Sequence, residues 1–409
     1  MLYFIINPSS SSGKGMAIWK KCSAILDEQH VTYHPYFLQG PGDAERIAQK
    51  MPSHAPCTVV IVGGDGTINE FLTALPSFEG ITFACLPTGS ANDFARGMDL
   101  GKWTENLLRR ILDGSNVHMI DVGITTSMMN GHSTGARASE ANVGNAARSS
   151  ETGVGNAARS SDANAENTVR SSDANAGNAA RSFAVSSGIG FDAAVCHAAE
   201  AGEGLAKKLL NTFHLGKLIY LVNALRMLYS MKLFRMKIRF RDPRVLSSAE
   251  VSGVSSTQVS GVSSAQASGG FSAEASGVSS AQASGVSATP EEGSSAGVLT
   301  LSFDKVCFAA AMNTRFEGGG FMFAPEADPS DAALDVIIAE GLPKWKILLL
   351  LPTAFSGNHV KHKGIHLIRC SSAELLCDSP QCVHTDGEHL GYSRAIRFET
   401  RPEKLRVIL

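Results

Sequence analysis

Short apolar runs alternate with amphipathic segments along the first 113 residues. Val59 to Val62 are four β-branched residues in a row, which predicts a buried strand of a parallel sheet. The same kind of run predicts strands at 2–6, 32–38 and 81–86, and apolar residues at helical spacing predict helices at 14–28 and 43–51. The alternation predicts an α/β domain, with a parallel sheet covered by helices on both faces.

After residue 117 the pattern changes to strands that follow one another with few helices between them. The runs at 118–126, 182–192, 235–241, 298–313 and 333–341 predict these strands, and 205–229 predicts a helix. We therefore expect two domains, 1–117 with the parallel sheet and 118–409 as a mainly antiparallel β-sandwich. The tail, 395–409, supplies closing strands and could return to the first domain.

Two inserts, 137–181 and 247–297, interrupt the second domain. The first repeats every eleven residues from Arg137 to Ala180, and the second repeats every eight from Ser252 to Glu291. Both are rich in Ser, Ala, Gly or Asn and poor in large apolar residues, so they cannot bury enough surface to offset the cost of ordering. We expect disordered inserts placed where hairpin turns would otherwise be.

Composition excludes several classes of protein. A net charge of −2, with 18% charged and 44% hydrophobic residues, shows no basic excess for nucleic acid. No apolar run reaches the ~18 residues that a membrane span requires, and the N-terminus lacks the charged start of a signal peptide. Eight scattered cysteines suit a reducing cytoplasm. Cys370, Cys377, Cys382 and His384 match no common zinc-finger spacing.

The glycine-rich turn after the Val59 strand is the first candidate for chemistry. Gly63, Gly64 and Gly66 allow a sharp turn and a close approach of the backbone to a ligand, because no Cβ intrudes. A helix begins directly afterwards, and its free N–H groups and dipole favour phosphate. Asp65 within the turn suits a magnesium ion or a hydroxyl better than a purely structural role.

Two further loops follow strands in the same domain. Asn7 and the Ser12-Gly13-Lys14 stretch follow the first strand and offer N–H, hydroxyl and ammonium donors, although the spacing is not that of a standard P-loop. Ser90-Ala91-Asn92-Asp93 follows the strand at 81–86 and precedes a helix, where a simple N-cap is the alternative.

Together these motifs resemble those of the diacylglycerol kinase catalytic-domain family. GGDGTINE, the NP…SGKG opening and LPTGSANDFAR stand in the family's order, and the last of these points to its bacterial lipid kinase branch, related to sphingosine kinases and distantly to NAD kinases. The resemblance implies that a nucleotide contacts Asn7, Ser12, Gly13, Lys14, Gly63, Gly64, Asp65, Gly66, Thr67, Asn69, Glu70, Ser90, Asn92 and Asp93.

An acidic loop at 325–336 is the candidate metal site. Its closely spaced carboxylates suit a hard cation, although a solvated acidic turn is an equal alternative. The resemblance implies a Mg²⁺ ion held by the side chains of Asp328 and Asp331 and by the carbonyl oxygen of Ala333. Ala332 stands where the family usually has glycine, which departs from the expected loop geometry.

The DGE segment near the C-terminus is the candidate for proton transfer. The resemblance implies that Glu388 is the general base, with Asp65 as a rival for that role. If 386–388 were a strand, Asp386 and Glu388 would share a face, and Asp386 could orient the base. A hairpin turn at Asp386-Gly387 is the structural alternative.

These observations predict an ATP- and Mg²⁺-dependent lipid kinase acting on diacylglycerol or a related lipid. A kinase of a soluble substrate such as NAD, or an inactive nucleotide-binding protein, remains the alternative. The expected partner is a lipid at a membrane surface, with a cytoplasmic or peripheral location at the inner membrane face. A homodimer is left open.

Overall fold

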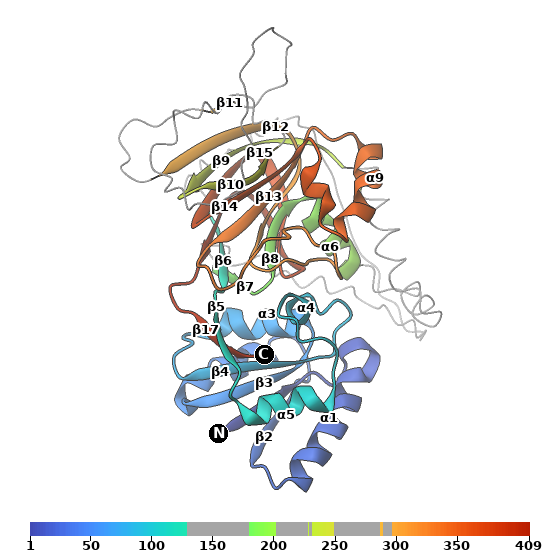
Figure 1. Cartoon of the computed structure of the whole chain (residues 1–409), viewed down its shortest axis with the longest axis vertical. Helices are drawn as coiled ribbons and strands as arrows, with labels where there is room; N and C mark the ends of the chain where they lie inside the picture. Colours follow the sequence, from blue (N-terminus) through green and yellow to red (C-terminus); the bar gives the residue numbers. More distant parts are fainter. Residues whose placement is uncertain (129–179, 202–227, 229–230, 249–286, 289–296) are drawn as a thin grey trace, which may run out of the picture.

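The computed structural model describes residues 1–128, 180–201, 228, 231–248, 287–288 and 297–409. These residues form two stacked domains, and both chain ends lie in the first domain (Figure 1). Most of the two predicted inserts and of the predicted helix at 205–229 lies outside the described residues. At their edges, Ala180 and Arg181 belong to a strand, as do Arg244–Ser248 and Ser287–Ala288.

The first domain is built on a six-stranded sheet in the order β2-β1-β3-β4-β17-β5. Five of these strands are parallel, and β5 alone runs antiparallel to β17. The strands are β1 (Leu2–Ile6), β2 (Tyr33–Phe37), β3 (Cys57–Gly63), β4 (Ile81–Pro87), β5 (Val117–Ile120) and β17 (Leu405–Ile408). The predicted α/β architecture is confirmed.

Helices cover this sheet because their apolar faces pack into one core with the strands. They are α1 (Ser10–Glu28), α2 (Asp43–Ala48), the 3₁₀ turn η1 (Met51–His54), α3 (Asp65–Ala74), α4 (Asp93–Gly97) and α5 (Glu105–Asp113). In Figure 1, α3 and α4 lie between the sheet and the second domain. The helix that begins in the glycine-rich turn and the helix formed by the NDFAR stretch therefore face the domain boundary.

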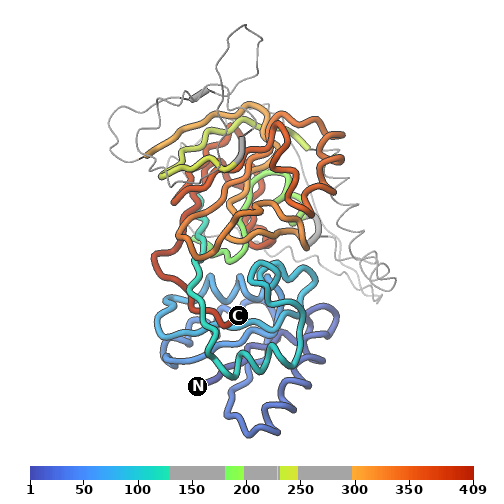
Figure 2. Tube along the Cα trace, viewed as in Figure 1, coloured from blue at the N-terminus to red at the C-terminus, as the bar shows by residue number. Residues whose placement is uncertain are grey.

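In the part of the chain that the structure describes, the backbone crosses between the domains twice. The run at 118–126, predicted as one strand, is two, because the chain leaves the first sheet after β5 and enters the second sheet with β6 (Gly123–Ser127). It returns through β16 (Glu388–Thr400) into β17, which pairs with β4 and β5. Figure 2 shows this last segment in red inside the first domain.

The second domain is an eleven-stranded antiparallel sheet with the main order β10-β14-β13-β12-β8-β15-β16-β6-β7, as predicted in outline. β9 pairs with both β12 and β15, and a buried apolar cluster fills the interior. Its other strands are β7 (Ala180–Phe183), β8 (Ser186–Gly190), β9 (Phe234–Arg241), β10 (Arg244–Ser248), β11 (Ser287–Ala288), β12 (Val298–Met312), β13 (Leu334–Glu340), β14 (Ile365–Cys370) and β15 (Ser372–Thr385).

Three helical segments complete the description of this domain: α6 (Phe191–Ala201), α9 (Lys344–Ala354) and the 3₁₀ turn η2 (Asn358–Lys361). The run at 182–192, predicted as one strand, instead spans the end of β7, the whole of β8 and the start of α6. Among the described residues, no helix has both the length and the apolarity to cross a bilayer.

Candidate active site

Three loops of the first domain meet at the carboxyl edge of its parallel sheet, where ligands bind in open α/β folds. They follow β1, β3 and β4, which are adjacent in the sheet. The glycine-rich turn and the loop after β4 pack backbone against backbone. A Cβ on Gly64 would lie 2.8 Å from the Cα of Gly89, and one on Gly89 would lie 2.6 Å from the Cα of Gly64. Glycine is therefore needed at both positions for the loops to meet.

The loop after β1 completes this edge. Asn7 donates to the hydroxyl of Thr67 at 3.1 Å, and the hydroxyls of Ser10 and Thr88 lie 2.5 Å apart. Ser11, Ser12 and Gly13 have positive φ angles of 43°, 59° and 95°, so the backbone turns sharply here before α1 continues. The side chains of Ser12 and Lys14 are exposed, so they can reach a ligand above the loops.

Asp65 connects two of the loops. Its carboxylate accepts the backbone N–H groups of Asp93 at 3.0 Å and Phe94 at 3.1 Å, at the start of α4. Burial raises the pKa of Asp65, and these N–H donors counter part of that rise. Since both carboxylate oxygens accept hydrogen bonds within the protein, this side chain is poorly placed to take a proton from a substrate.

Two predicted nucleotide contacts on α3 point elsewhere. Glu70 accepts the N–H of Gly42 at 2.6 Å, at the start of α2. Asn69 donates to the carbonyl of Ser182 at 2.9 Å and to the carboxylate of Asp386 at 3.0 Å, both in the second domain. The structure thus brings the loop residues together at the sheet edge, while Asn69 and Glu70 hold neighbouring segments.

Asp386 lies in a turn and not in a strand, so the backbone here is the Asp386-Gly387 hairpin turn that was expected as the alternative. Thr385 pairs with Glu388, and the two residues between them have φ angles of +48° and +88°, as in a two-residue Asp-Gly hairpin. The Asp386 carboxylate accepts four hydrogen bonds, from Asn69 and from the N–H groups of 184–186, at 2.8–3.0 Å. It joins α3 of the first domain to the β7–β8 connection of the second.

Glu388 reaches across the domain boundary to the glycine-rich turn. Its carboxylate lies directly against Gly66, so closely that a Cβ on this glycine would overlap its Oε1 atom. Gly66 is the second residue of α3, beside the free N–H groups at the helix start. A carboxylate of the second domain therefore stands beside the turn of the first domain that suits phosphate.

A buried polar cluster lies behind this edge, and sequence reasoning missed it. His384 Nε2 lies 3.2 Å from the Asp192 carboxylate and 3.3 Å from that of Glu317. Burial raises the pKa of Glu317 to about 7, with Asp192 adding to the rise and His384 opposing it. Asp93 also belongs here, since it accepts the N–H of Gly319 at 2.7 Å. Burial and the nearby Asp65 raise the pKa of Asp93 to about 6.

This cluster has the residue types of a metal site, but the histidine is in the wrong protonation state. Potential ligand atoms of Cys196, Glu317 and His384 lie within 4.8 Å of one another, the one such group among the described residues. The N–H of Gly387 donates to His384 Nδ1 at 3.2 Å, so Nδ1 is an acceptor and Nε2 carries the hydrogen. A protonated Nε2 cannot ligate a metal, and its hydrogen is shared between two carboxylates instead.

The residues of the predicted magnesium loop do not fit a metal site in this arrangement. Asp331 accepts the N–H of Ala333 through Oδ1, while its Oδ2 lies 3.1 Å from Nη1 of Arg369. Arg369 also binds Asp335, with its Nε 2.6 Å from Oδ1. Asp328 accepts both the N–H and the hydroxyl of Ser330. A guanidinium group thus already binds Asp331, one of the two expected carboxylate ligands, and Ser330 binds the other.

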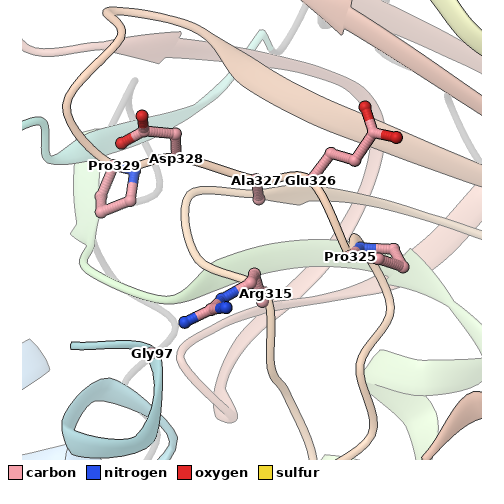
Figure 3. A pocket seen from close by; sticks show the side chains of 7 residues that line it. All are labelled: Gly97, Arg315, Pro325, Glu326, Ala327, Asp328 and Pro329. Atoms are coloured by element: carbon pink, nitrogen blue, oxygen red, sulfur yellow. The ribbon is translucent and has the colours of Figure 1, made fainter. Parts of the chain in front are cut away.

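Further contacts tie this loop to the end of β5. Asp121 accepts the N–H of Ala332 at 2.6 Å and pairs with Lys404 at 3.1 Å. Ala332 has a φ of +61°, a conformation that glycine adopts at lower cost. An open pocket of about 330 Å³ lies beside the loop, lined by Gly97, Arg315 and 325–329. Figure 3 shows these lining residues. In this view the Arg315 side chain points toward Gly97 of the first domain.

Comparison with known proteins follows the domain division. Residues 1–124 match the family model of the diacylglycerol kinase catalytic domain, and residues 300–409 match that of the YegS C-terminal NAD kinase beta sandwich-like domain. A relative from Bacillus subtilis (strain 168), named "Putative lipid kinase YtlR", is 22% identical over 408 residues. This match covers 99% of the chain and 98% of the relative.

Two other similarities agree with this match. A protein of Yersinia pestis (strain Pestoides F), named "Probable lipid kinase YegS-like", is 39% identical over 93 residues, which are 22% of this chain and 31% of the relative. The crystal structure of "a putative diacylglycerol kinase" from Bacillus anthracis str. Sterne superposes with a TM-score of 0.59 at 16% identity. It covers 100% of this chain and 94% of the other, and it shows a shared fold.

Proposed function

Residues 1–124 match the diacylglycerol kinase catalytic domain, and from this premise we propose that the chain transfers the γ-phosphoryl group of MgATP to a lipid hydroxyl. Diacylglycerol or a closely related lipid is the proposed acceptor. The observation that carries the proposal is the position of Glu388 against Gly66, because it puts a carboxylate of one domain beside the phosphate-suited turn of the other.

The proposed division of labour follows from the contacts. Phosphoryl transfer depends mostly on positioning and on neutralising charge. The backbone N–H groups at the start of α3, with the Ser12–Lys14 loop, would hold the phosphates of the nucleotide. As the acceptor oxygen bonds to the γ-phosphorus, its proton passes to the Glu388 carboxylate and ADP leaves. Magnesium arrives with the nucleotide, and no step uses the 328–333 loop.

Asp65 is the other candidate for the general base, and its hydrogen bonds argue against that role. Both oxygens already accept N–H groups at the start of α4. Asp386 is similarly committed, with four hydrogen bonds to its carboxylate. These contacts suit Asp65 and Asp386 as positioning residues, and Glu388 is proposed to meet the acceptor because its carboxylate lies against Gly66.

The test is Glu388→Gln, which keeps size and hydrogen-bonding shape but cannot accept the proton. We expect turnover with labelled ATP and diacylglycerol in detergent micelles to fall at least about a hundredfold, with KM for ATP near wild type. Glu399→Gln is the matched control, because Glu399 lies on the same strand and is paired with Arg397 at the surface. If Glu388→Gln retains most of the activity, the assignment of Glu388 as the general base is wrong.

The same assay separates the alternatives. Label that appears only in a soluble acceptor such as NAD, with no lipid product, contradicts a lipid kinase. Nucleotide binding without turnover on any acceptor indicates an inactive protein. If Asp65→Asn abolishes turnover with ATP binding intact while Glu388→Gln does not, the base is Asp65.

A further inference from the structure

The helix α9 has an apolar outer face that is exposed to solvent among the described residues. Its inner face is buried through Ile347, Leu350 and Ala354. The outer face carries Trp345, Leu348, Leu349 and Pro352, and Phe355 follows at the helix end; these positions are three or four residues apart and so share one side. Trp345 is 64% exposed, Leu349 65%, Phe355 56% and Leu348 37%.

Such a concentration of exposed apolar groups is unusual in this molecule. Eleven large apolar side chains are exposed among the described residues, and four of them belong to this one short segment. A helix that is apolar on both sides is normally buried on both sides. The outer face of 345–355, called here the α9 face, therefore indicates a binding surface.

The charges around the α9 face identify what it binds. Residues 341–364 contain four lysines and no aspartate or glutamate. Lys344 and Lys346 lie on the two sides of the apolar stripe by helical spacing, and Lys361 and Lys363 follow in η2 and the loop after it. Apolar and tryptophan side chains bordered by lysines are typical of segments that lie in the interface of a membrane with anionic lipids.

The α9 face is connected to the candidate active site through one short hairpin. Phe355 stacks on Phe321 with ring centroids 4.3 Å apart, and Met322 N–H donates to the Ala354 carbonyl at 2.8 Å. Phe321 pairs with Glu317, and Gly319 between them binds the Asp93 carboxylate. Figure 1 shows α9 at the outer edge of the second domain, above α6.

We propose that the α9 face docks on an anionic phospholipid membrane, with Trp345 and Leu349 entering the acyl boundary and the lysines contacting headgroups. The membrane is then the source of the lipid acceptor, a consequence that rests on the proposed function. Docking itself is independent of turnover, so the two can fail separately.

The test uses the intact chain and sedimentation with phosphatidylglycerol–phosphatidylcholine vesicles. Trp345→Ser with Leu349→Ser should weaken binding at least about tenfold, because two large apolar groups no longer leave water. Met119→Ser with Leu376→Ser is the matched control, since it removes two apolar groups outside the α9 face that are 46% and 53% exposed, and it should bind as wild type. Added salt should weaken wild-type binding.

Tryptophan fluorescence gives a second measurement that does not depend on a disruptive variant. Trp19 is buried and Trp103 is half-buried, so Trp345 should supply the blue shift when vesicles are added. Trp345→Phe should keep the binding and lose the shift. A shift that survives in Trp345→Phe would overturn the proposal.

Other results would also overturn it. One such result is a wild-type protein that fails to bind anionic vesicles. Another is a Trp345→Ser, Leu349→Ser double variant that binds them as tightly as wild type. A double variant that changes from dimer to monomer by light scattering would assign the face to a second copy instead. The proposed function has its own readout, turnover of a short-chain diacylglycerol dissolved as monomers. The double variant should retain that turnover, and its absence in wild type would count against the kinase but not against docking.

Discussion

Asp386 provides the sharpest test of how the two domains are held together. Its Oδ1 atom accepts the N–H groups of Val185 and Ser186, and its Oδ2 accepts Asn69 and the N–H of Ala184. Asp386→Asn converts one of these oxygens into an amide NH₂ that faces two donors. Two charge-assisted hydrogen bonds are lost, each worth roughly 1.5–3 kcal/mol.

Part of that loss is offset. Burial raises the pKa of Asp386, which means that holding its charge inside the protein costs free energy, and asparagine removes this cost. We therefore expect the free energy of unfolding to fall by roughly 2–4 kcal/mol, a large part of the 5–15 kcal/mol typical of a native protein. For domains of this size, that corresponds to a melting temperature lower by roughly 4–16 °C.

The assay is thermal and urea denaturation of both variants beside wild type. Asp378→Asn is the matched control on β15, because its carboxylate meets Arg235 at 3.4 Å on the surface and should contribute less than about 1 kcal/mol. If Asp386→Asn unfolds like Asp378→Asn, the four hydrogen bonds do not hold the domains as argued. If it keeps its stability but loses turnover, Asp386 acts in the chemistry and is not only a positioning residue.

Two further predictions concern the charged groups that sequence reasoning missed. The folded-state pKa of Glu317, raised by burial from 4.5 to about 7, means that its contribution to stability is full below about pH 4.5 and is lost as pH rises through 7. Glu317→Gln should therefore flatten the pH dependence of the free energy of unfolding between those values, whereas Glu399→Gln should not; equal slopes in the two variants would contradict this. Arg369→Ala leaves Asp331 and Asp335 without their cation and should lower the free energy of unfolding by about 3 kcal/mol or more, while Arg239→Ala, which breaks an exposed pair, should cost under about 1 kcal/mol. Mg²⁺ without nucleotide should raise the melting temperature of Arg369→Ala and not of wild type, and a rise in wild type would restore the metal site.

Local patterns in the sequence were enough to predict the strands, helices and glycine-rich loops of the first domain. Four β-branched residues followed by glycines predict a buried strand and a turn, because both consequences depend on neighbours along the chain. The α/β class followed from the alternation, and the structure confirms it. The sequence also located the Asp-Gly hairpin as an alternative, since that dipeptide favours the required backbone angles.

Only the tertiary structure decided where the carboxylates point. The sequence shows Asp65, Asp386 and Glu388 only as three acidic residues. In the structure Asp65 and Asp386 accept backbone N–H groups, while Glu388 lies against Gly66 across the domain boundary. Arg369 lies 34 residues after Asp335 and reaches it because β13 and β14 pair. Such ion pairs form between residues that are distant in the chain, so no local pattern could show that a guanidinium binds the Asp331 carboxylate, or that the outer side of α9 is exposed among the described residues.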